Sequence, residues 1–585
     1  MSHLENLKKT TTLAELALLL GYKPKALSYI LYKIPQINKY KDFTIPKKNG
    51  GERRIQAPVD KVKHLQKRLA VLLSQCFDEI SKKANHKRSL SHGFRKDHSI
   101  STNANNHTNK RHVFNIDLMD FFPSINFGRV RGFFIKNSHF GLKPKIATII
   151  AQIACHNNEL PQGSPCSPII SNLIGHLLDI RMANFAKKTK CTYSRYADDL
   201  TFSTNRKEFP EKIASQNNGN EWATSRTLKK EIEKVGFKVN EKKTSLQYKT
   251  SRQIATGLVV NKKVNIKKEY YRQTRSMCHS LFQSNEFFLG NTYSAKPAIS
   301  ENAKINSTSP ATNSKTPLPK NPQGKIKQLE SILSYIYSVK RRHDRDNAGK
   351  RKNYPNAITK LYRKFLFYKH FFSLNCPLII CEGKTDIVYL KCALRQLANE
   401  YGEFIEKTGP SFILKIDFLN LTKNLKDVLA ISEGTGGLGS LMGIYEIYMK
   451  PFKGEGKKHP VIILIDNDSG SKEIIEIMKR KKKWDPSKPF AFFTENLYVV
   501  HISSESGTSE MAIEDLFDDQ TQNTTVDGKK FNRKPKIDSA SEYGKIVFAE
   551  KVIRANENSI NFDGFKKVLN SFKAATQDYN KRITV

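Results

Sequence analysis

Two patterns of apolar and polar positions divide the chain. Up to about residue 290, short apolar runs such as "HVFNIDLMDFFPSI" and the two halves of "YSRYADDLTFS" alternate with polar turns, which predicts short strands mixed with helices. From about residue 375, apolar runs such as "PLIICEG" and "HPVIILIDNDSG" each end in a polar or Gly-rich loop and lead into a helix. This alternation of strand and helix is typical of a parallel sheet.

The segment between these two parts has its own composition. Residues 291–323 are rich in Ser, Thr, Asn, Pro and Lys and predict a flexible linker or insertion. From Gly324 apolar residues return at helical spacing among many Lys and Arg, so residues 324–374 are predicted as a basic helical segment. We therefore expect an α+β domain over 1–290, then the linker, the basic helices, and an α/β domain with a parallel sheet over 375–585.

The chain carries far more positive than negative charge. Its 585 residues include 99 Lys plus Arg against 55 Asp plus Glu, a formal net charge of +44. Such a surplus favours an extended anionic partner, above all nucleic acid. No apolar run approaches the roughly 18–20 residues that span a bilayer, and no signal-peptide pattern is present, so we expect a cytoplasmic protein without a membrane partner. The eight cysteines include no Cys-x-x-Cys pair and predict neither a zinc ribbon nor disulfides.

Three aspartates form the first candidate site. Asp117 lies in an apolar strand, and Asp198 and Asp199 lie at the tip of a predicted hairpin. If a sheet brings them together, their oxygen ligands suit Mg²⁺, and two such ions can activate an attacking hydroxyl and hold a leaving phosphate. The alternative is a solvated turn, because Asp is common in turns.

The sequence around these aspartates resembles that of reverse transcriptases. "RYADDLTF" is similar to their Tyr-x-Asp-Asp hairpin, and "NIDLMDFFPSI" is similar to the strand that carries the first catalytic aspartate. The resemblance implies a right-hand polymerase fold with fingers, palm and thumb, with the basic helices over 324–374 as the thumb. It also implies a two-metal Mg²⁺ site and dNTP substrates.

Three further stretches resemble nucleotide-binding motifs of the same family. They are "KKNGGERRIQAP" of the fingers, "LPQGSPCSPIISN" under the incoming nucleotide, and "GFKVNEKKTS" near the triphosphate. An aromatic ring after the first aspartate would exclude a 2′-hydroxyl and so favour dNTPs. Taken singly, each of these residues reads as core or solvated surface. By resemblance the nucleotide-binding residues are Arg53, Phe122, Gln162 and Lys243, with Arg54 next to Arg53 and Gly163 in a tight turn.

Two stretches narrow the resemblance to retron reverse transcriptases. Asn103, Ala104 and His107 match an Asn-Ala-x-x-His element, and Ala255, Thr256 and Gly257 resemble a Val-Thr-Gly element with Ala in place of Val. The resemblance implies that Asn103, His107, Thr256 and Gly257 take part in recognising a cognate non-coding RNA (msr-msd). It implies DNA synthesis from the 2′-hydroxyl of an internal guanosine, which yields a branched RNA–DNA product, msDNA. Without an evident ribonuclease H segment, a host ribonuclease H would remove the template.

A second acidic constellation lies in the last part of the chain. Glu382 ends one apolar run and Asp386 follows it, Asp466 and Asp468 end a later run, and "MAIEDLF" adds Glu514 and Asp515. Acidic side chains at the carboxyl edge of a parallel sheet lie where α/β proteins place their sites. The pattern resembles the TOPRIM domain, in the form found in overcoming-lysogenization-defect nucleases, and implies Mg²⁺ or Mn²⁺ bound by Glu382, Asp386, Asp466, Asp468 and Glu514, with Glu382, Asp466 and Asp468 catalytic. The alternative is that strand-end carboxylates cap helices.

The run from Gly434 to Gly439 also satisfies G-x-G-x-x-G, the pattern of dinucleotide sites. Because it lies between the two acidic motifs of the predicted sheet, we expect a Gly-rich loop rather than an NAD site.

Together these motifs predict a retron reverse transcriptase fused to a TOPRIM nuclease effector, which by resemblance implies bacterial antiphage defence and leaves an oligomer possible. One alternative is a TOPRIM part that binds nucleic acid without cleaving it. Another is an intron-type reverse transcriptase that primes from a DNA 3′ end, although no maturase or endonuclease segment is visible.

Overall fold

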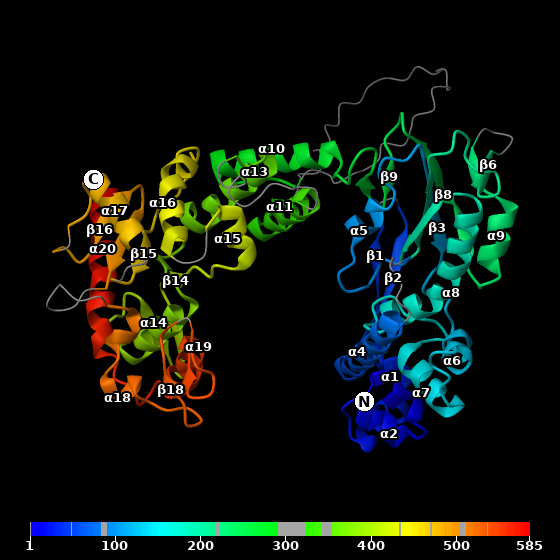
Figure 1. Cartoon of the computed structure of the whole chain (residues 1–585), viewed down its shortest axis with the longest axis horizontal. Helices are drawn as coiled ribbons and strands as arrows, with labels where there is room; N and C mark the ends of the chain where they lie inside the picture. The colour runs from blue at the N-terminus through cyan, green and yellow to red at the C-terminus, as the bar shows by residue number, and fades with distance from the viewer. Residues whose placement is uncertain are drawn as a thin grey trace, which may run out of the picture. The chain divides into compact units, whose positions relative to one another are not determined.

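The computed structural model describes residues 2–47, 50–83, 90–216, 221–289, 323–341, 354–431, 435–467, 471–485, 487–502, 511–534 and 536–584. They form two compact units (Figure 1). The first contains the residues up to Tyr270, and the second contains chiefly those from Tyr271 onward. The predicted linker over 291–323 lies outside the described residues, except for Gln323.

An antiparallel sheet forms the centre of the first unit. Its strands follow the order β4-β5-β3-β8, with bounds β3 (His112–Met119), β4 (Thr192–Tyr196), β5 (Asp199–Thr204) and β8 (Lys238–Tyr248). Nearly every side chain of β3 is buried, so this strand is covered on both faces. The register places Asp117 of β3 opposite Asp199 of β5.

Helices pack around this sheet and share one apolar core with it. The long helix α8 (Ser167–Lys188) lies against β4 and buries residues along most of its length. The other helices of the first unit are α1 (His3–Lys9), α2 (Leu13–Leu19), α3 (Pro24–Ser28), η1 (Tyr29–Lys33), η2 (Gln36–Asn38), α4 (Asp60–Lys83), α5 (Ile100–Asn105), α6 (Phe127–Lys136), α7 (Pro144–Ala154) and α9 (Arg226–Glu233).

Short hairpins extend from this body: β1 (Tyr40–Pro46) with β2 (Glu52–Pro58), β6 (Ala214–Gln216) with β7 (Trp222–Thr224), and β9 (Ile254–Ala255) with β10 (Leu258–Val259). The loop that follows α7 lies against β2, where the Gln56 N–H donates to the Gln162 carbonyl over 2.8 Å. Gly163 in this loop has φ +121°, and a Cβ there would lie 2.9 Å from the Gln56 carbonyl oxygen. A side chain at this position would therefore separate the loop from the hairpin.

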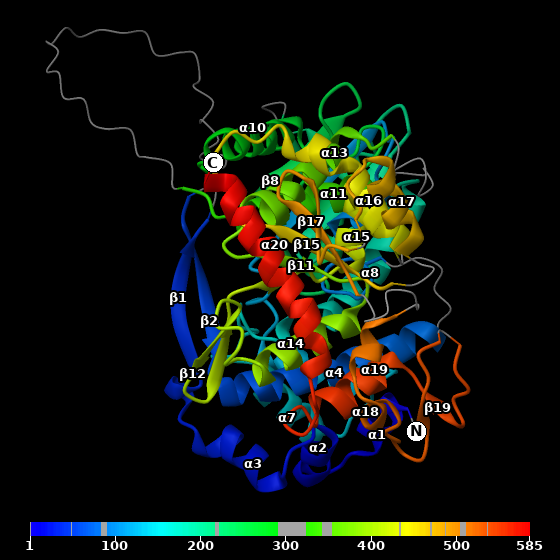
Figure 2. The ribbon, with the colours of Figure 1, turned by 90° about the vertical axis from the view of Figure 1, so that its left-hand side faces the viewer.

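The second unit contains the parallel sheet that the sequence predicts. Its strand order is β14-β11-β15-β17-β16, with bounds β11 (Leu378–Ile380), β14 (Asp417–Phe418), β15 (Val461–Ile465), β16 (Ala491–Thr494) and β17 (Leu497–His501). All neighbours are parallel except β16, which pairs antiparallel with β17. α20 (Lys566–Thr584) crosses the sheet on one face (Figure 2), and α14 (Lys384–Gln396) and η6 (Phe548–Arg554) contribute to the same core.

The predicted basic helices are present as α11 (Ile326–Arg341), α13 (Ala357–Phe367) and η3 (Tyr368–Phe372). Leu329, Leu333 and Ile336 are fully buried along one side of α11, as the helical spacing requires. α10 (Lys268–Ser284) from Tyr271, α11 up to Ser338, and α13 group with the second unit.

The remaining elements of the second unit are β12 (Ile405–Thr408), β13 (Ser411–Leu414), α15 (Lys423–Leu429), α16 (Thr435–Met449), α17 (Lys472–Arg480), η5 (Ile513–Leu516), α18 (Asp519–Gln522), β18 (Lys530–Phe531), β19 (Glu542–Tyr543), α19 (Lys545–Val547) and η7 (Asp563–Phe565). In the ranges given above, no helix combines the length and apolarity that crossing a lipid bilayer requires.

Candidate active site

The three aspartates of the first unit meet at one end of its sheet. Asp117 pairs with Asp199 across β3 and β5. Asp198 occupies the two-residue turn between β4 and β5 together with Ala197, which adopts φ +55°. The Asp198 carbonyl also accepts the Leu118 N–H over 3.0 Å, which ties the turn to β3. Neighbouring strands lie about 4.8 Å apart, so the register alone brings these side chains close together.

Mutual repulsion is evident in the electrostatics of this site. Burial and the charges of Asp198 and Asp117 raise the pKa of Asp199 to about 7. Burial, with the charge of Asp117, also raises the pKa of Asp198. Lys243 opposes both shifts. Like charges that repel in this way are stabilised by a bound cation.

Lys243 makes an ion pair with the first aspartate. Its Nζ atom lies 3.1 Å from both carboxylate oxygens of Asp117, and the Asn240 amide donates to Asp117 Oδ2 over 3.1 Å. The sequence predicts Lys243 near a triphosphate, and in the structure more than half of its side chain is exposed. A metal ion that binds Asp117 would therefore compete with Lys243 for the carboxylate.

A buried ion pair supports the hairpin from within. Arg195 Nε lies 2.7 Å from Asp179 Oδ1, and Arg195 Nη1 donates to the Ala197 carbonyl over 3.0 Å. The Arg195 side chain is fully buried. Burial alone would lower the pKa of Arg195, but the charge of Asp179 outweighs this effect and raises it. The sequence patterns did not indicate Arg195 or Asp179. Only the general rule that a buried charge needs a charged partner could have pointed to them.

Apart from Lys243 on β8, the predicted nucleotide-binding residues lie on three separate segments. Arg53 projects from β2 and exerts a favourable charge effect on Asp198, whereas Arg54 pairs with Asp42 of β1, with Nε–Oδ2 at 3.1 Å. Phe122 is half-buried next to Phe121 and Phe94. Gln162 is half-buried in the loop that bonds to β2. Because Arg54 pairs with Asp42, Arg53 is the arginine whose charge acts on Asp198 in the aspartate hairpin.

Two of the predicted RNA-recognition residues lie inside the protein. Asn103 and His107 are fully buried, and the His107 ring bonds to Ser203 and Ser194 at 2.7 Å each. Burial lowers the pKa of His107 to about 3, so the ring stays neutral. Ser194 also donates to Asn103 Oδ1 over 2.7 Å. In this conformation any contribution of these side chains to RNA recognition is indirect.

Thr256 and Gly257 form the tight turn between β9 and β10. Their φ values of +47° and +81° define a two-residue hairpin loop. The Thr256 hydroxyl donates to the Ile100 carbonyl at the start of α5 over 3.1 Å. The second retron-like element therefore contacts the helix that carries Asn103 of the first, although the two are far apart in the sequence.

In the second unit, acidic side chains gather at the carboxyl edge of the parallel sheet. Asp466 follows β15 and accepts the Ile513 N–H over 3.1 Å, and Glu514 is fully buried. Lys545 Nζ lies 3.0 Å from Glu514 Oε2. Burial alone would lower the pKa of Lys545, but Glu514, Asp466 and Asp386 outweigh it and raise this pKa. Lys545, which the sequence analysis missed, is therefore the cation of this cluster.

The other predicted acids of this unit take part in local structure. Asp386 is buried in α14 and accepts the Gly383 N–H over 2.8 Å, which caps the start of this helix. Glu382 accepts from the Ser471 hydroxyl over 3.3 Å. Asp515 pairs with Arg533 at 2.7 Å. Asp468 lies outside the described residues, as does Gly434, and the rest of the Gly-rich run begins helix α16.

The donor atoms of the first site suit Mg²⁺, since carboxylate oxygens are its usual protein ligands. As the side chains stand, however, no three His, Cys, Asp or Glu residues of the described ranges are close enough together to hold a metal ion. The ion pair with Lys243 engages both carboxylate oxygens of Asp117, one of the predicted ligands. The residues therefore fit the metal in chemistry, and binding requires them to rearrange.

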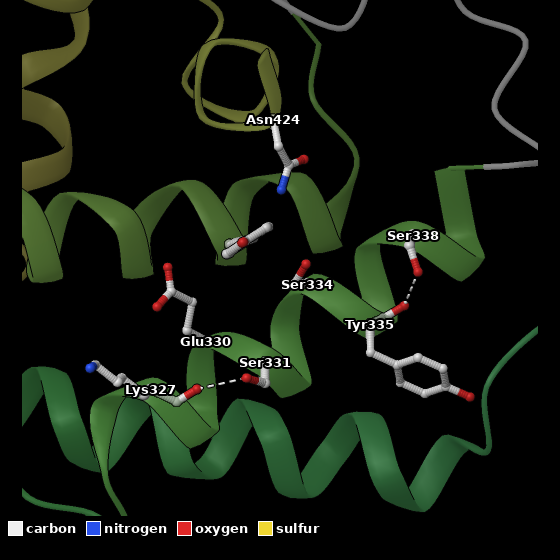
Figure 3. A pocket seen from close by; sticks show the side chains of 8 residues that line it. Lys327, Glu330, Ser331, Ser334, Tyr335, Ser338 and Asn424 are labelled. Atoms are coloured by element: carbon white, nitrogen blue, oxygen red, sulfur yellow. Dashed lines mark hydrogen bonds between the residues drawn. The ribbon is translucent and has the colours of Figure 1, made fainter. Parts of the chain in front are cut away.

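A polar pocket with a volume of about 700 Å³ lies along helix α11 in the second unit (Figure 3). Its lining includes a row of hydroxyl groups from Ser331, Ser334 and Ser338, with Lys327 at one end. Ser331 and Ser338 donate back to helix carbonyls over 2.8 Å. Glu330 pairs with Lys369 at 2.8 Å. Because the Ser331 and Ser338 hydroxyls already donate within the helix, an anionic ligand in this pocket would contact Lys327 rather than these hydroxyl hydrogens.

Comparison with known proteins identifies the first unit. The family model described as "Reverse transcriptase (RNA-dependent DNA polymerase)" matches residues 45–279. The retron Mx65 reverse transcriptase of Myxococcus xanthus is 32% identical over 43% of this chain and 58% of its own length. The chain thus spans little more than half of that relative. Among solved structures, apo telomerase from Candida tropicalis is 16% identical and overlaps with a TM-score of 0.28 over 40% of this chain and 56% of that chain.

The match to a second relative covers more of that relative's own length. The retron Ec86 reverse transcriptase of Escherichia coli is 33% identical over 42% of this chain and 70% of its own length. The range matched by the family model, residues 45–279, contains the aspartate hairpin and both retron-like elements. The chain therefore belongs to the retron reverse transcriptases.

Proposed function

We propose that the first unit is an RNA-directed DNA polymerase that uses dNTPs. The observation that carries this proposal is the pairing of Asp117 with Asp199 across β3 and β5, with Asp198 in the adjoining turn. Reverse transcriptases generally use Mg²⁺, which when bound activates the attacking hydroxyl and neutralises the leaving phosphate. In this role the three aspartates hold the metal, and β3, β5 and the buried Arg195 fix their positions.

The other residues of the site bind and orient the nucleotide. Arg53 on β2 and Lys243 on β8 supply positive charge for the phosphates. Phe122 supplies the aromatic surface under the sugar, and the loop with Gln162 supports the base. Residues 1–290 then correspond to fingers and palm, and residues 324–374 to a thumb in which Lys327 on α11 contacts the duplex backbone.

The retron relatives support a more specific product. We propose that the template is a cognate non-coding RNA (msr-msd), and that synthesis starts from a 2′-hydroxyl to give msDNA. A host ribonuclease H would remove the copied RNA. If the enzyme were of the intron type, synthesis would start from a DNA 3′ end and the product would carry no branch.

The test examines nucleic acid that co-purifies with protein expressed with its flanking DNA. Denaturing gels before and after ribonuclease and debranching treatment compare the wild type with Asp198→Asn/Asp199→Asn. We expect a discrete DNA whose mobility changes with both treatments and which the variant lacks. The control is Asp97→Asn, an exposed aspartate at φ +60° that accepts Asn readily. Failure of the wild type to extend any supplied primer on an RNA template would refute the polymerase.

We also propose that residues 375–585 form a TOPRIM-type, metal-dependent nuclease effector in antiphage defence. The gathering of Asp466, Glu514 and Asp386 around Lys545 at the carboxyl edge of a parallel sheet supports this. Mg²⁺ or Mn²⁺ would bind the carboxylates of this edge, and Lys545 would stabilise negative charge on a phosphate.

Glu382→Ala and Asp466→Ala test the nuclease. Both should abolish cleavage of supplied DNA or RNA and any growth inhibition on expression, while Glu476→Ala, an exposed position on α17, should change neither. Retention of growth inhibition without cleavage in the two variants would identify the unit as a scaffold that binds nucleic acid.

A further inference from the structure

A basic pocket of about 670 Å³ opens at the end of the first unit's sheet that lies away from the aspartates. His112 at the start of β3 lines it, and Asp117 lies five residues further along the strand. At about 3.3 Å per residue, the two ends are separated by about 16 Å. A ligand in this pocket would therefore not occupy the candidate active site.

The pocket lining carries positive charge and no carboxylate. Arg111, Lys207 and Lys249 all line it and are exposed. Among the described residues, none of the three forms an ion pair. Three exposed cations around one concave surface attract an anion with several charges, such as the backbone of a nucleic acid.

The pocket also offers an aromatic surface. Tyr248 at the end of β8 is 40% exposed. Its hydroxyl accepts a hydrogen bond from Trp222 Nε1 over 3.0 Å, and its ring meets His112 at 5.4 Å in an edge-on contact. These contacts hold the ring in place, so an unpaired base can stack on it without further ordering of the side chain.

Backbone hydrogen bonds fix the loops that carry the cations. The Lys249 N–H donates to the Arg111 carbonyl over 2.9 Å, and the Arg111 N–H donates to Asn205 Oδ1 over 2.8 Å. The Asn109 N–H donates to the Val260 carbonyl over 3.1 Å. The pocket is thus built from three chain segments whose relative positions are already set.

These segments adjoin the two retron-like elements. His107 lies two residues before Asn109 and bonds to Ser203, which lies two residues before Asn205. The turn with Thr256 and Gly257 follows the Lys249 loop and leads to Val260. The buried residues of both elements therefore position the walls of the pocket, although they do not line it.

We propose that this pocket is a docking site for an unpaired segment of the RNA that the polymerase copies, a proposal that rests on the function given above. Phosphates contact Arg111, Lys207 and Lys249, and one base stacks on Tyr248. The Asn109 and Asn205 amides and the Thr250 hydroxyl are suited to contact sugar hydroxyls, which distinguish RNA from DNA. The two retron-like elements thus contribute to RNA binding through the pocket that they support.

Binding is measured with the full chain and three probes: a short RNA hairpin with an unpaired loop, a DNA hairpin of the same sequence, and phosphatidylserine vesicles. Arg111→Ala/Lys207→Ala/Lys249→Ala is compared with Lys136→Ala/Lys143→Ala/Lys145→Ala, which removes three exposed charges on and beside α6 and α7. Tyr248→Ala is compared with Tyr248→Phe, which keeps the ring. Extension of a supplied primer on an unstructured RNA template is measured in parallel.

The first triple variant should lose affinity for the RNA hairpin about tenfold or more at physiological salt, with its salt slope reduced by about 2. The control triple and Tyr248→Phe should retain affinity, and primer extension should continue in every variant. Equal losses in both triple variants, unchanged RNA binding, equal binding of the DNA hairpin, or patch-dependent binding of the vesicles would each overturn the proposal. If the wild-type protein itself did not extend the primer, the proposed polymerase function would be refuted instead.

Discussion

Arg195 and Asp179 form a two-point ion pair beneath the aspartate hairpin, with Nε–Oδ1 at 2.7 Å and Nη2–Oδ2 at 2.8 Å. The same guanidinium donates to the Ala197 carbonyl in the turn. Tyr193 adds a hydrogen bond to Asp179 over 2.9 Å. One buried cation thus connects helix α8 to the turn that holds Asp198.

Replacing Asp179 with Asn should destabilise the protein strongly. The change leaves the Arg195 charge buried without its partner, which costs about 3–5 kcal/mol. Chemical denaturation measures the loss. Arg181→Ala, on the same helix, removes an exposed ion pair with Glu231, and it should cost less than about 1 kcal/mol. Similar losses in the two variants would contradict the supporting role of the buried pair.

Gly93→Ala should displace the aspartate hairpin. A Cβ at Gly93 would lie 2.7 Å from the Ala197 backbone nitrogen, which is too close for any real contact. We expect a loss of about 1–3 kcal/mol together with reduced primer extension. Gly132→Ala in α6 is the matched control, since a Cβ there meets nothing within 4 Å. It should stabilise the protein by about 0.5–1 kcal/mol, because Ala favours helix more than Gly does. Full activity of Gly93→Ala would show that the hairpin can shift without loss.

Asp199→Asn should stabilise the metal-free protein at high pH. The pKa of Asp199 is about 7 when folded, above its usual value near 4. The folded state therefore binds more protons than the unfolded state between about pH 4 and pH 7, so this carboxyl lowers stability progressively as pH rises across that range. At pH 8 in chelator, the variant should be more stable than the wild type by about 1–3 kcal/mol.

The same pair of proteins gives the control for this prediction. At pH 4 the stability difference should be small, since the carboxyl is then protonated in the folded state and about half protonated in the unfolded state. Mg²⁺ should raise the melting temperature of the wild type at pH 8 and have less effect on Asp199→Asn. A stability difference independent of pH would show that the charge of Asp199 is not its cause.

Lys545→Met should destabilise the second unit, because it leaves the buried Glu514 carboxylate without its cation. We expect a loss of about 1–3 kcal/mol, reduced from the value for a fully buried pair because the Lys545 side chain is 38% exposed. Glu514→Gln/Lys545→Met should recover much of this loss, since neither charge remains. A double variant as unstable as the sum of the two single changes would contradict coupling between the residues.

The patterns of apolar positions predicted much of the architecture. The runs around Asp117 and around Asp198 and Asp199 predicted adjacent strands, and strand register alone then brings the carboxylates together. The continuous apolar runs before Glu382 and Asp466, each followed by a helix, predicted the strands of a parallel sheet. These features depend on local periodicity, which the sequence displays directly.

Other features depend on partners that no local pattern reveals. Asn103 and His107 lie in a short polar stretch, yet hydrogen bonds to β4 and β5 bury both side chains completely. Arg195 looks like any other cation in a chain with 99 Lys plus Arg. Its burial follows from the position of Asp179 on a helix that packs under the same strand. Lys545 joins the acidic cluster only through the folding of the last part of the chain.

The contacts of His107 constrain which substitutions related chains can carry. The imidazole bridges Ser194 of β4 and Ser203 of β5 with one ring nitrogen each. Loss of either serine hydroxyl leaves a ring nitrogen buried without a partner, whereas an apolar side chain at position 107 removes the partner of the Ser203 hydroxyl, while Ser194 keeps its bond to Asn103. The three positions should therefore vary together among homologous proteins, and a second change at Ser203 should suppress the defect of a His107 variant in a genetic screen.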